Sequence, residues 1–147
     1  MKQLSRYLLL PLTFFCGLFV YAAVYTDPIE GFWFNETKEA KIQIYKSTDG
    51  KFYGKIVWLK IPLKDGKPKL DEKNPDNKLK KQPIVSLLIL KGFEKDGEQY
   101  TEGTIYDPDN GKTYDCKMTY KGGKKLSIRG YIGISLIGRT TVWEKAE

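Results

Sequence analysis

The chain has 147 residues, of which 41% are hydrophobic and 14% are aromatic, and its formal net charge is +7. This length and composition predict one domain, large enough to have a hydrophobic core that needs no disulfide or metal to stabilise it. Histidine is absent. Its absence excludes Ser-His and Cys-His nucleophiles, histidine-containing zinc sites and a histidine pH switch.

The N-terminus has the pattern of a secretory signal peptide. Two basic residues precede an apolar run that ends at Val20, and the small residues Ala22 and Ala23 follow it. The run is too short to span a bilayer comfortably, which favours a cleaved signal over an anchor. We therefore expect a signal peptide at 1–22, a mature single domain at 23–147 without an integral membrane segment, and a periplasmic or secreted protein.

Removal of that segment leaves 23 basic and 18 acidic residues, a net charge of +5. It also leaves Cys116 as the sole cysteine, so no intramolecular disulfide can form even in an oxidising compartment. Cys116 alternates in phase with Tyr114 and Met118, and such apolar surroundings raise the pKa of a thiol and make it inert. We expect a buried small hydrophobe there, not a nucleophile.

Turn dipeptides punctuate the chain and separate short segments with the character of β-strands. Five of them offer the positive φ angles of tight hairpins: Asp49-Gly50, Asp65-Gly66, Asp96-Gly97, Asn110-Gly111 and Gly122-Gly123. Most segments between them alternate apolar and polar residues, as strands with one buried face do. Eight strands are predicted, at 31–34, 41–46, 52–59, 86–91, 101–105, 114–120, 126–130 and 139–144.

Eight antiparallel strands in hairpin order predict a closed barrel. An open sheet would leave unpaired backbone groups at both edges, and closure removes them. Eight strands is also the size at which the interior is either filled by side chains or holds one small ligand. The expected fold class is all-β, an eight-stranded antiparallel up-and-down barrel, with a two-sheet sandwich as the alternative.

One long lysine-rich segment interrupts the predicted strands. Between Lys60 and Lys81 it contains eight lysines and four acidic residues, and so holds most of the net charge of the mature chain. Asn74-Pro75 fits a helix N-cap followed by proline at the first helical position, and Pro83 ends the segment. We expect one short helix in this long loop, closing one end of the barrel through Leu79.

Two motifs invite a chemical interpretation that the residues do not support. A calcium loop at YDPDNGKTY fails because Gly111 and Met118 stand where the EF-hand needs an oxygen ligand and a glutamate. Glu102 could form a glycosidase-like pair with Asp115 or Asp107, but Glu102 and Asp115 fall on the polar faces of their strands. We expect no enzyme activity, no catalytic residue, no metal, no cofactor and no nucleic-acid partner.

Several large side chains occupy the apolar phase of the predicted strands. The candidate ligand-binding residues are Phe52, Trp58, Tyr114 and Met118, with Arg129 or Arg139 available for a carboxylate head group. They either fill the barrel as core or line a pocket for a small apolar or amphipathic ligand. Interior volume decides between these two hypotheses.

The expected function is that of an exported, non-enzymatic barrel protein that binds such a ligand. The alternative is a basic surface-interaction protein of the cell envelope with no internal ligand. It would contact an anionic envelope component, whether lipid, glycan or protein, through the loop between Lys60 and Lys81.

Four motifs in order resemble a known family. They are the Gly31-x-Trp33 opening, the Asn-Pro-Asp loop, YDPDNGKTY and the closing GRTTVWEK. As a set, from about Gly31 to Lys145, they are similar to the bacterial exported family catalogued as domain of unknown function 2147. The Gly-x-Trp opening and a basic residue in the last strand also resemble the lipocalin and related calycin barrels.

The resemblance implies a lipocalin-like barrel and no established activity or ligand. In such barrels a tryptophan plugs one end and a late basic side chain packs over its indole. This implies structural closure by Gly31, Trp33 and Arg139. A cation-π contact of this kind contributes on the order of 0.5 to 2 kcal/mol.

Overall fold

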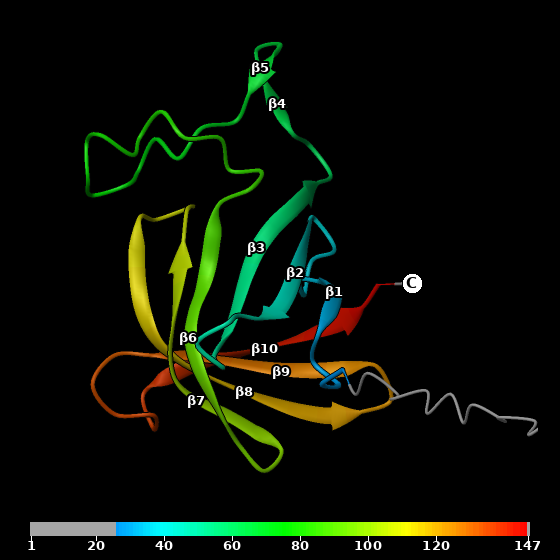
Figure 1. Ribbon diagram of the computed structural model, residues 1–147. Coiled ribbons are helices and arrows are strands. Elements are labelled where there is room, and N and C mark those ends of the chain that lie inside the picture. Colours follow the sequence, from blue (N-terminus) through cyan, green and yellow to red (C-terminus); the bar gives the residue numbers. More distant parts are fainter. Residues whose placement is uncertain (1–25, 147) are drawn as a thin grey trace, which may run out of the picture.

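The computed structural model describes residues 26–146, so the predicted signal segment at 1–22 lies outside the described residues. Eight strands close into an antiparallel barrel in the order β1-β10-β9-β8-β7-β6-β3-β2 (Figure 1). They are β1 Gly31–Phe34, β2 Ala40–Lys46, β3 Phe52–Leu59, β6 Leu88–Asp96, β7 Gln99–Asp107, β8 Lys112–Gly122, β9 Lys125–Tyr131 and β10 Gly138–Lys145. The predicted up-and-down barrel is confirmed.

The long segment between β3 and β6 contains a separate two-stranded hairpin, β4 Leu63–Lys64 with β5 Lys67–Pro68. The short helix expected after Asn74-Pro75 is absent, and consecutive turns take its place. The Asn74 side chain does accept the hydrogen bond of a cap, from the Asp76 amide at 2.9 Å. Asp76 then accepts from the Lys78 amide at 2.9 Å, and such local side-chain bonds compete with helix formation.

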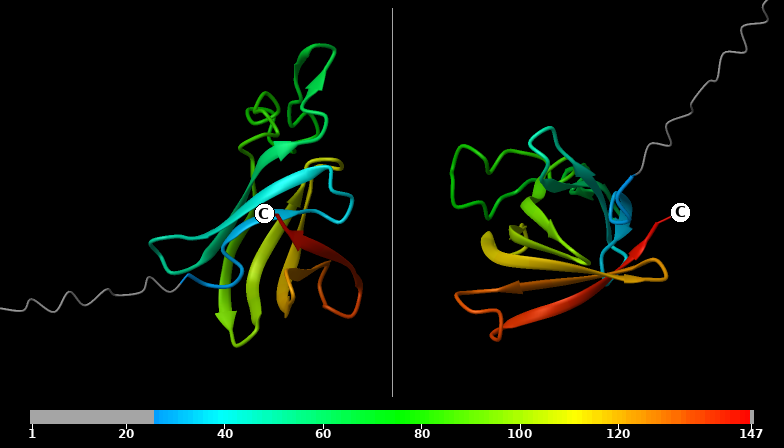
Figure 2. Two further views of the ribbon diagram at one scale, coloured as in Figure 1. Left: turned by 90° about the vertical axis from the view of Figure 1, so that its right-hand side faces the viewer. Right: turned by 60° about the horizontal axis from the view of Figure 1, so that its bottom comes forward.

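One end of the barrel, which we call the closed end, is packed with large side chains. The fully buried residues include Trp33, Phe52, Phe93, Tyr100, Met118 and Leu126. The turns that join β1 to β2, β7 to β8 and β9 to β10 lie together on the other side of the molecule (Figure 2, left). They mark what we call the open end.

Trp33 and Lys145 tie the first strand to the last at the closed end. Trp33 is fully buried and pairs with Lys145 in the β1–β10 ladder. Its indole donates to the Ile29 carbonyl at 2.7 Å, and the Lys145 ammonium lies 5.2 Å from the ring centroid. The expected plug is therefore present, but the prediction that Arg139 covers the indole is wrong, because Lys145 does so.

Two inward-facing glycines allow neighbouring strands to pack closely. A Cβ on Gly103 would lie 2.4 Å from the ring of Phe93, and one on Gly54 would lie 2.7 Å from Leu90. The register of β7 against β8 shifts between Tyr100 and Gly103, and Glu102 has a φ of 58°. This bulge, together with the missing side chain, gives the Phe93 ring its place in the core.

A buried carboxylate also fastens the N-terminal segment to the closed end. Asp27 is paired with the Lys95 ammonium at 2.6 Å and accepts a hydrogen bond from the Tyr100 hydroxyl. Burial by itself would raise the pKa of the Asp27 carboxyl, but the bonds from Lys95 and Tyr100 outweigh it and hold that pKa below its usual value.

No helix long and apolar enough to cross a membrane occurs among residues 26–146.

Substituting Gly103 by alanine should destabilise the barrel, because the new methyl group overlaps the buried Phe93 ring. Overpacking of this kind costs about 1 to 3 kcal/mol in the free energy of unfolding, measured by urea denaturation. Gly130→Ala is the matched control, since its Cβ would meet its nearest neighbour at an ordinary 3.5 Å. Equal stability of the two variants would contradict the close approach.

Asp27→Asn should lower the free energy of unfolding by about 1 to 3 kcal/mol at pH 7, because the paired charge is lost. The pKa of Asp27 is lower in the folded than in the unfolded protein, where it is about 4. The charged carboxylate therefore stabilises the fold at pH values above about 4, and this stabilisation is lost as the pH falls through the pKa of the folded state. The gap between the parent and the variant should therefore close as the pH falls below about 4. Asp96→Asn, an exposed carboxylate of the same end, should show no such gap at either pH.

Candidate functional site

The open end of the barrel contains a hollow of about 560 Å³. Its walls come from the inward faces of β7 to β10, and its floor includes the buried side chains of Ile128 and Trp143. A smaller hollow of about 270 Å³ adjoins it under the long β3–β6 segment and shares Asn35, Asp107 and Trp143. The larger volume lies in the range of small-molecule sites in proteins.

A glycine at an inward position of β9 contributes to the space in the hollow. Gly130 lies on the inner face of β9, in phase with Leu126 and Ile128, and pairs with Arg139 of β10. A Cβ on Gly130 would touch only Ile105 and Tyr114, at 3.5 and 3.7 Å. The space above Gly130 is therefore open to a ligand.

Polar groups form the rim of the hollow. Arg139 pairs with Glu36 of the β1–β2 turn at 3.2 Å. On the other side, the Asn110 amide donates to Asp107 at 2.7 Å and to the Tyr114 hydroxyl at 3.0 Å. An apolar floor with a polar rim suits a molecule that has an apolar body and a polar head.

The predicted ligand-binding residues divide among three places. Tyr114 lines the hollow. Phe52 and Met118 are buried in the packed closed end and do not line it. Arg129 points outward, where its guanidinium donates to the Ser135 carbonyl at 2.7 Å and to the Thr140 hydroxyl at 2.8 Å. Contact of any of these residues with a ligand stays a prediction.

Trp58 lies on the outside of the barrel, with 41% of its surface exposed. The ladder pairs Ile42 with Ile56 but Lys41 with Trp58, so one extra residue of β3 bulges between them. A bulge of one residue moves the next side chain to the opposite face. Trp58 therefore packs edge-to-face on Phe34, at 6.0 Å between ring centroids, and the expectation that it points inward is wrong.

The residues that line the hollow were only partly found from the sequence. Arg139 was predicted as a head-group partner and lies at the rim. Ile105, Gly130 and Trp143 were not singled out, although Gly130 alternates in phase with Ile128 in β9. Alternation identifies the inward face, but it does not indicate which inward positions lie at the open end.

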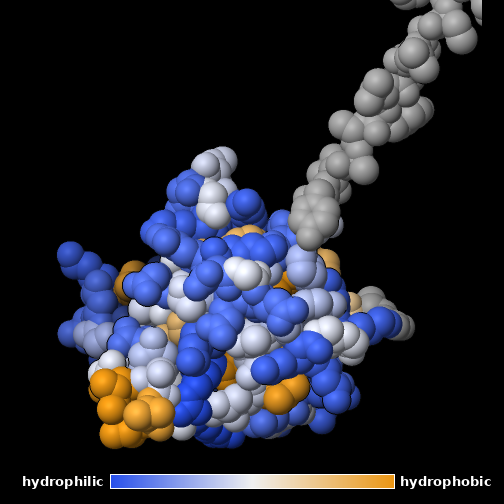
Figure 3. All heavy atoms as spheres, turned by 90° about the horizontal axis from the view of Figure 1, so that it is seen from below, coloured by the Kyte–Doolittle hydropathy of each residue, from blue (hydrophilic) through white to orange (hydrophobic). Residues whose placement is uncertain are grey.

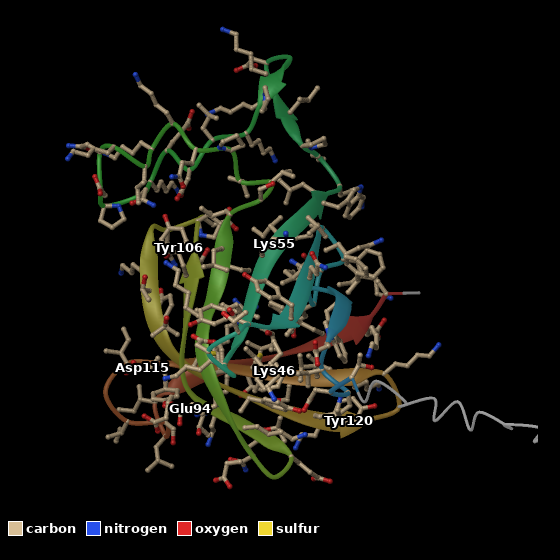
Figure 4. The ribbon with its side chains drawn as sticks, in the orientation of Figure 1. Lys46, Lys55, Glu94, Tyr106, Asp115 and Tyr120 are labelled. Atoms are coloured by element: carbon tan, nitrogen blue, oxygen red, sulfur yellow. The ribbon has the colours of Figure 1, made fainter. Side chains whose placement is uncertain are left out.

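The long β3–β6 segment is fastened over the barrel by a buried carboxylate. Asp71 is fully buried and accepts hydrogen bonds from Tyr106 of β7 and from the Asn74 amide, both at 2.7 Å. Figure 4 shows Tyr106 at the end of β7 next to this segment. Burial and the bond to Asp71 raise the pKa of Tyr106 to about 12, so its hydroxyl stays a donor at neutral pH.

The β7–β8 turn supports the same segment. The Lys73 ammonium donates to the Asp109 carbonyl. Gly111 has a φ of 72°, and a Cβ there would lie 2.0 Å from the Lys73 carbonyl oxygen. Lys64 pairs with Glu72 at 3.1 Å. Binding of an anionic envelope component through this loop stays a prediction.

The cysteine and the possible metal ligands are candidate reactive groups within residues 26–146. Cys116 is buried, as expected, and burial raises the pKa of its thiol to about 12. Among the described residues, no three histidine, cysteine or carboxylate side chains lie close enough to hold a metal ion. The absence of enzyme activity stays a prediction.

Asp71→Ala should loosen the lysine-rich loop, because it removes the acceptor of two buried hydrogen bonds. Loss of such bonds costs about 1 to 3 kcal/mol, so tryptic cleavage after Lys78, Lys80 or Lys81 should be roughly fivefold faster or more. Glu72→Gln is the control, since its pair with Lys64 is exposed and contributes little. Equal cleavage rates in the parent and Asp71→Ala would show that Asp71 does not anchor the loop.

The fold and the sequence were compared with those of known proteins. A solved structure titled "Protein HP1028 from the human pathogen Helicobacter pylori belongs to the lipocalin family" is similar with a TM-score of 0.73 and 21% sequence identity. The match covers 83% of this chain and 85% of that one, and it shows a shared lipocalin-like fold. A comparison with curated proteins found no match. The model of the family described as "Uncharacterized protein conserved in bacteria (DUF2147)" matches residues 31–145, and the chain belongs to that family.

Proposed function

We propose that the protein binds one small apolar or amphipathic molecule in the open end of its barrel. The observation that carries this proposal is the hollow of about 560 Å³, which has the buried side chains of Ile128 and Trp143 in its floor. The hollow opens to solvent at its rim and has apolar side chains below, with a few polar groups around its mouth. Concave sites with this distribution of apolar and polar groups are typical of small-molecule binding.

The lining orients the expected ligand. Ile105, Ile128 and Trp143 supply an apolar lining, so an aliphatic or aromatic body would lie against them. Burial of that body contributes about 25 cal/mol per Å² of apolar surface. Arg139 at the rim supplies a guanidinium for an anionic head group such as a carboxylate. The pair of Arg139 with Glu36 is exposed and contributes little, so an anionic head group can take the place of Glu36 at the guanidinium.

The same proposal places the protein outside the cytoplasm and assigns it no enzymatic step. Export rests on the signal-peptide pattern at 1–22. The non-enzymatic part rests on the lack of histidine and on the buried state of Cys116. The lipocalin-like fold supports a binding role as an analogy at the level of fold.

Gly130→Leu tests the site by filling it, because the new side chain would project into the hollow between Ile105 and Tyr114. We expect the affinity for the amphipathic probe 1-anilinonaphthalene-8-sulfonate to fall at least about tenfold, measured by fluorescence titration. The backbone at Gly130 is not in the left-handed region, so the variant should keep its fold.

Ser127→Leu is the matched control. Ser127 lies on the same strand in the outward phase, next to the buried Ile128, so the same side chain is added outside the barrel. It should bind the probe like the parent protein. Probe binding that survives Gly130→Leu, in a variant with the parent's circular dichroism, would place the ligand elsewhere and refute the proposal.

A further inference from the structure

The turn between β9 and β10 exposes a compact group of aliphatic side chains. We call residues 132–137 (IGISLI) the aliphatic loop. The exposed fractions of its large side chains are 68% for Ile132, 58% for Ile134, 86% for Leu136 and 71% for Ile137. Figure 3 shows this group as an orange cluster at the lower left of a mainly blue surface. Exposed apolar groups gathered in this way mark interaction sites.

The loop is held in this exposed conformation by hydrogen bonds. The Arg129 guanidinium donates to the carbonyls of Ser135 and Leu136, at 2.7 and 3.2 Å. Within the loop, the Ile134 amide donates to the Ile132 carbonyl at 3.0 Å, and the Ile137 amide donates to the Ile134 carbonyl at 3.1 Å. Because these bonds fix the backbone, the aliphatic side chains are presented to the outside as an ordered group.

We propose that the aliphatic loop inserts into the surface of an anionic phospholipid bilayer. Its size favours a bilayer over a protein partner. A stable protein interface buries about 800 Å² on each side and needs about 20 residues, whereas this apolar group is confined to six residues at the tip of a turn. Shallow insertion into the headgroup region needs only a few large apolar side chains.

The net charge of the protein, rather than the charges next to the loop, favours an anionic bilayer over a neutral one. Arg129 and Arg139 flank the loop in the sequence, and Lys117 pairs with Arg129 in the β8–β9 ladder. Two carboxylates are also near: Asp115 pairs with Tyr131 in the same ladder, and Glu36 pairs with Arg139. Asp107 lines the same mouth, so the charges next to the loop nearly balance. The chain without residues 1–22 still has a net charge of +5, and anionic lipid attracts a cationic protein.

Docking in this way would turn the mouth of the hollow toward the lipid, since Ile132 and Ile137 also line the hollow. This inference goes beyond the proposed function, because it names a bilayer as a partner and stands whether or not the hollow holds a ligand. The other two aliphatic side chains, Ile134 and Leu136, do not line the hollow. Changing them separates the two properties.

The test is co-sedimentation of the protein without residues 1–22 with vesicles. One set contains phosphatidylglycerol and phosphatidylcholine in equal parts, and the other contains phosphatidylcholine alone. We expect binding to the first set and at least about tenfold weaker binding of the double variant Ile134→Ser/Leu136→Ser, because two apolar side chains no longer enter the lipid. The same variant should bind 1-anilinonaphthalene-8-sulfonate like the parent.

Two control variants make the test specific to the loop. Ile61→Ser/Leu63→Ser removes two aliphatic side chains that are 61% and 50% exposed elsewhere, and it should bind vesicles like the parent. Lys78→Glu/Lys80→Glu/Lys81→Glu reverses charge on the lysine-rich loop. If vesicle binding is lost in either control and kept in the aliphatic-loop variant, the bilayer contact lies elsewhere and the inference is overturned.

A direct readout comes from Leu136→Trp, which adds a reporter at the most exposed position of the loop. Its emission should be quenched by brominated lipid in the anionic vesicles, while the parent's tryptophans should be much less affected. Lack of quenching would overturn the inference. So would a parent protein that sediments as a dimer without lipid and an Ile134→Ser/Leu136→Ser variant that sediments as a monomer, since a second copy would then cover the loop.

Discussion

The barrel depends on how its first strand meets its last. The β1–β10 ladder is short, with register pairs only at Trp33 with Lys145 and Phe34 with Glu144, so side chains must reinforce it. Trp33 provides this reinforcement in three ways: it is fully buried, its indole donates to the Ile29 carbonyl, and the Lys145 ammonium lies over its ring. Lys145 also donates to the Pro28 carbonyl at 2.8 Å. Closure and the plug are therefore one cluster of contacts.

Concentrating the large aromatic side chains at the closed end leaves the open end without filling. Phe52, Phe93 and Tyr100 pack around the plug, and Gly103 makes room for them. Toward the open end the inward position of β9 is Gly130, which has no side chain to fill the space that a core residue would occupy. The same distribution of bulk that stabilises the barrel thus creates the hollow. The stabilising contacts and the hollow therefore lie at opposite ends of one small fold.

Two loops of opposite character lie at the open end: the lysine-rich loop covers the smaller hollow, and the aliphatic loop borders the larger one. Buried Asp71 fastens the lysine-rich loop to Tyr106 of β7, and Arg129 fastens the aliphatic loop to the outer face of β9. Functional loops on a rigid barrel are a common arrangement, because the barrel fixes where the loops stand. Here one loop presents cations and the other presents aliphatic side chains.

Alternation of apolar and polar residues, with turn dipeptides between the segments, was enough to predict eight strands, their antiparallel closure and the burial of Cys116. These features follow from the two-residue period of a strand.

The tertiary structure decided the rest. A bulge moved Trp58 to the outside, since a single extra residue reverses the face. Competing side-chain bonds replaced the expected helix with turns. Lys145 rather than Arg139 covers Trp33 because the stagger of β1 against β10 selects which cation meets the indole. The volume of the hollow could not be predicted from the sequence either, because it depends on where inward residues from different strands fall along the barrel axis.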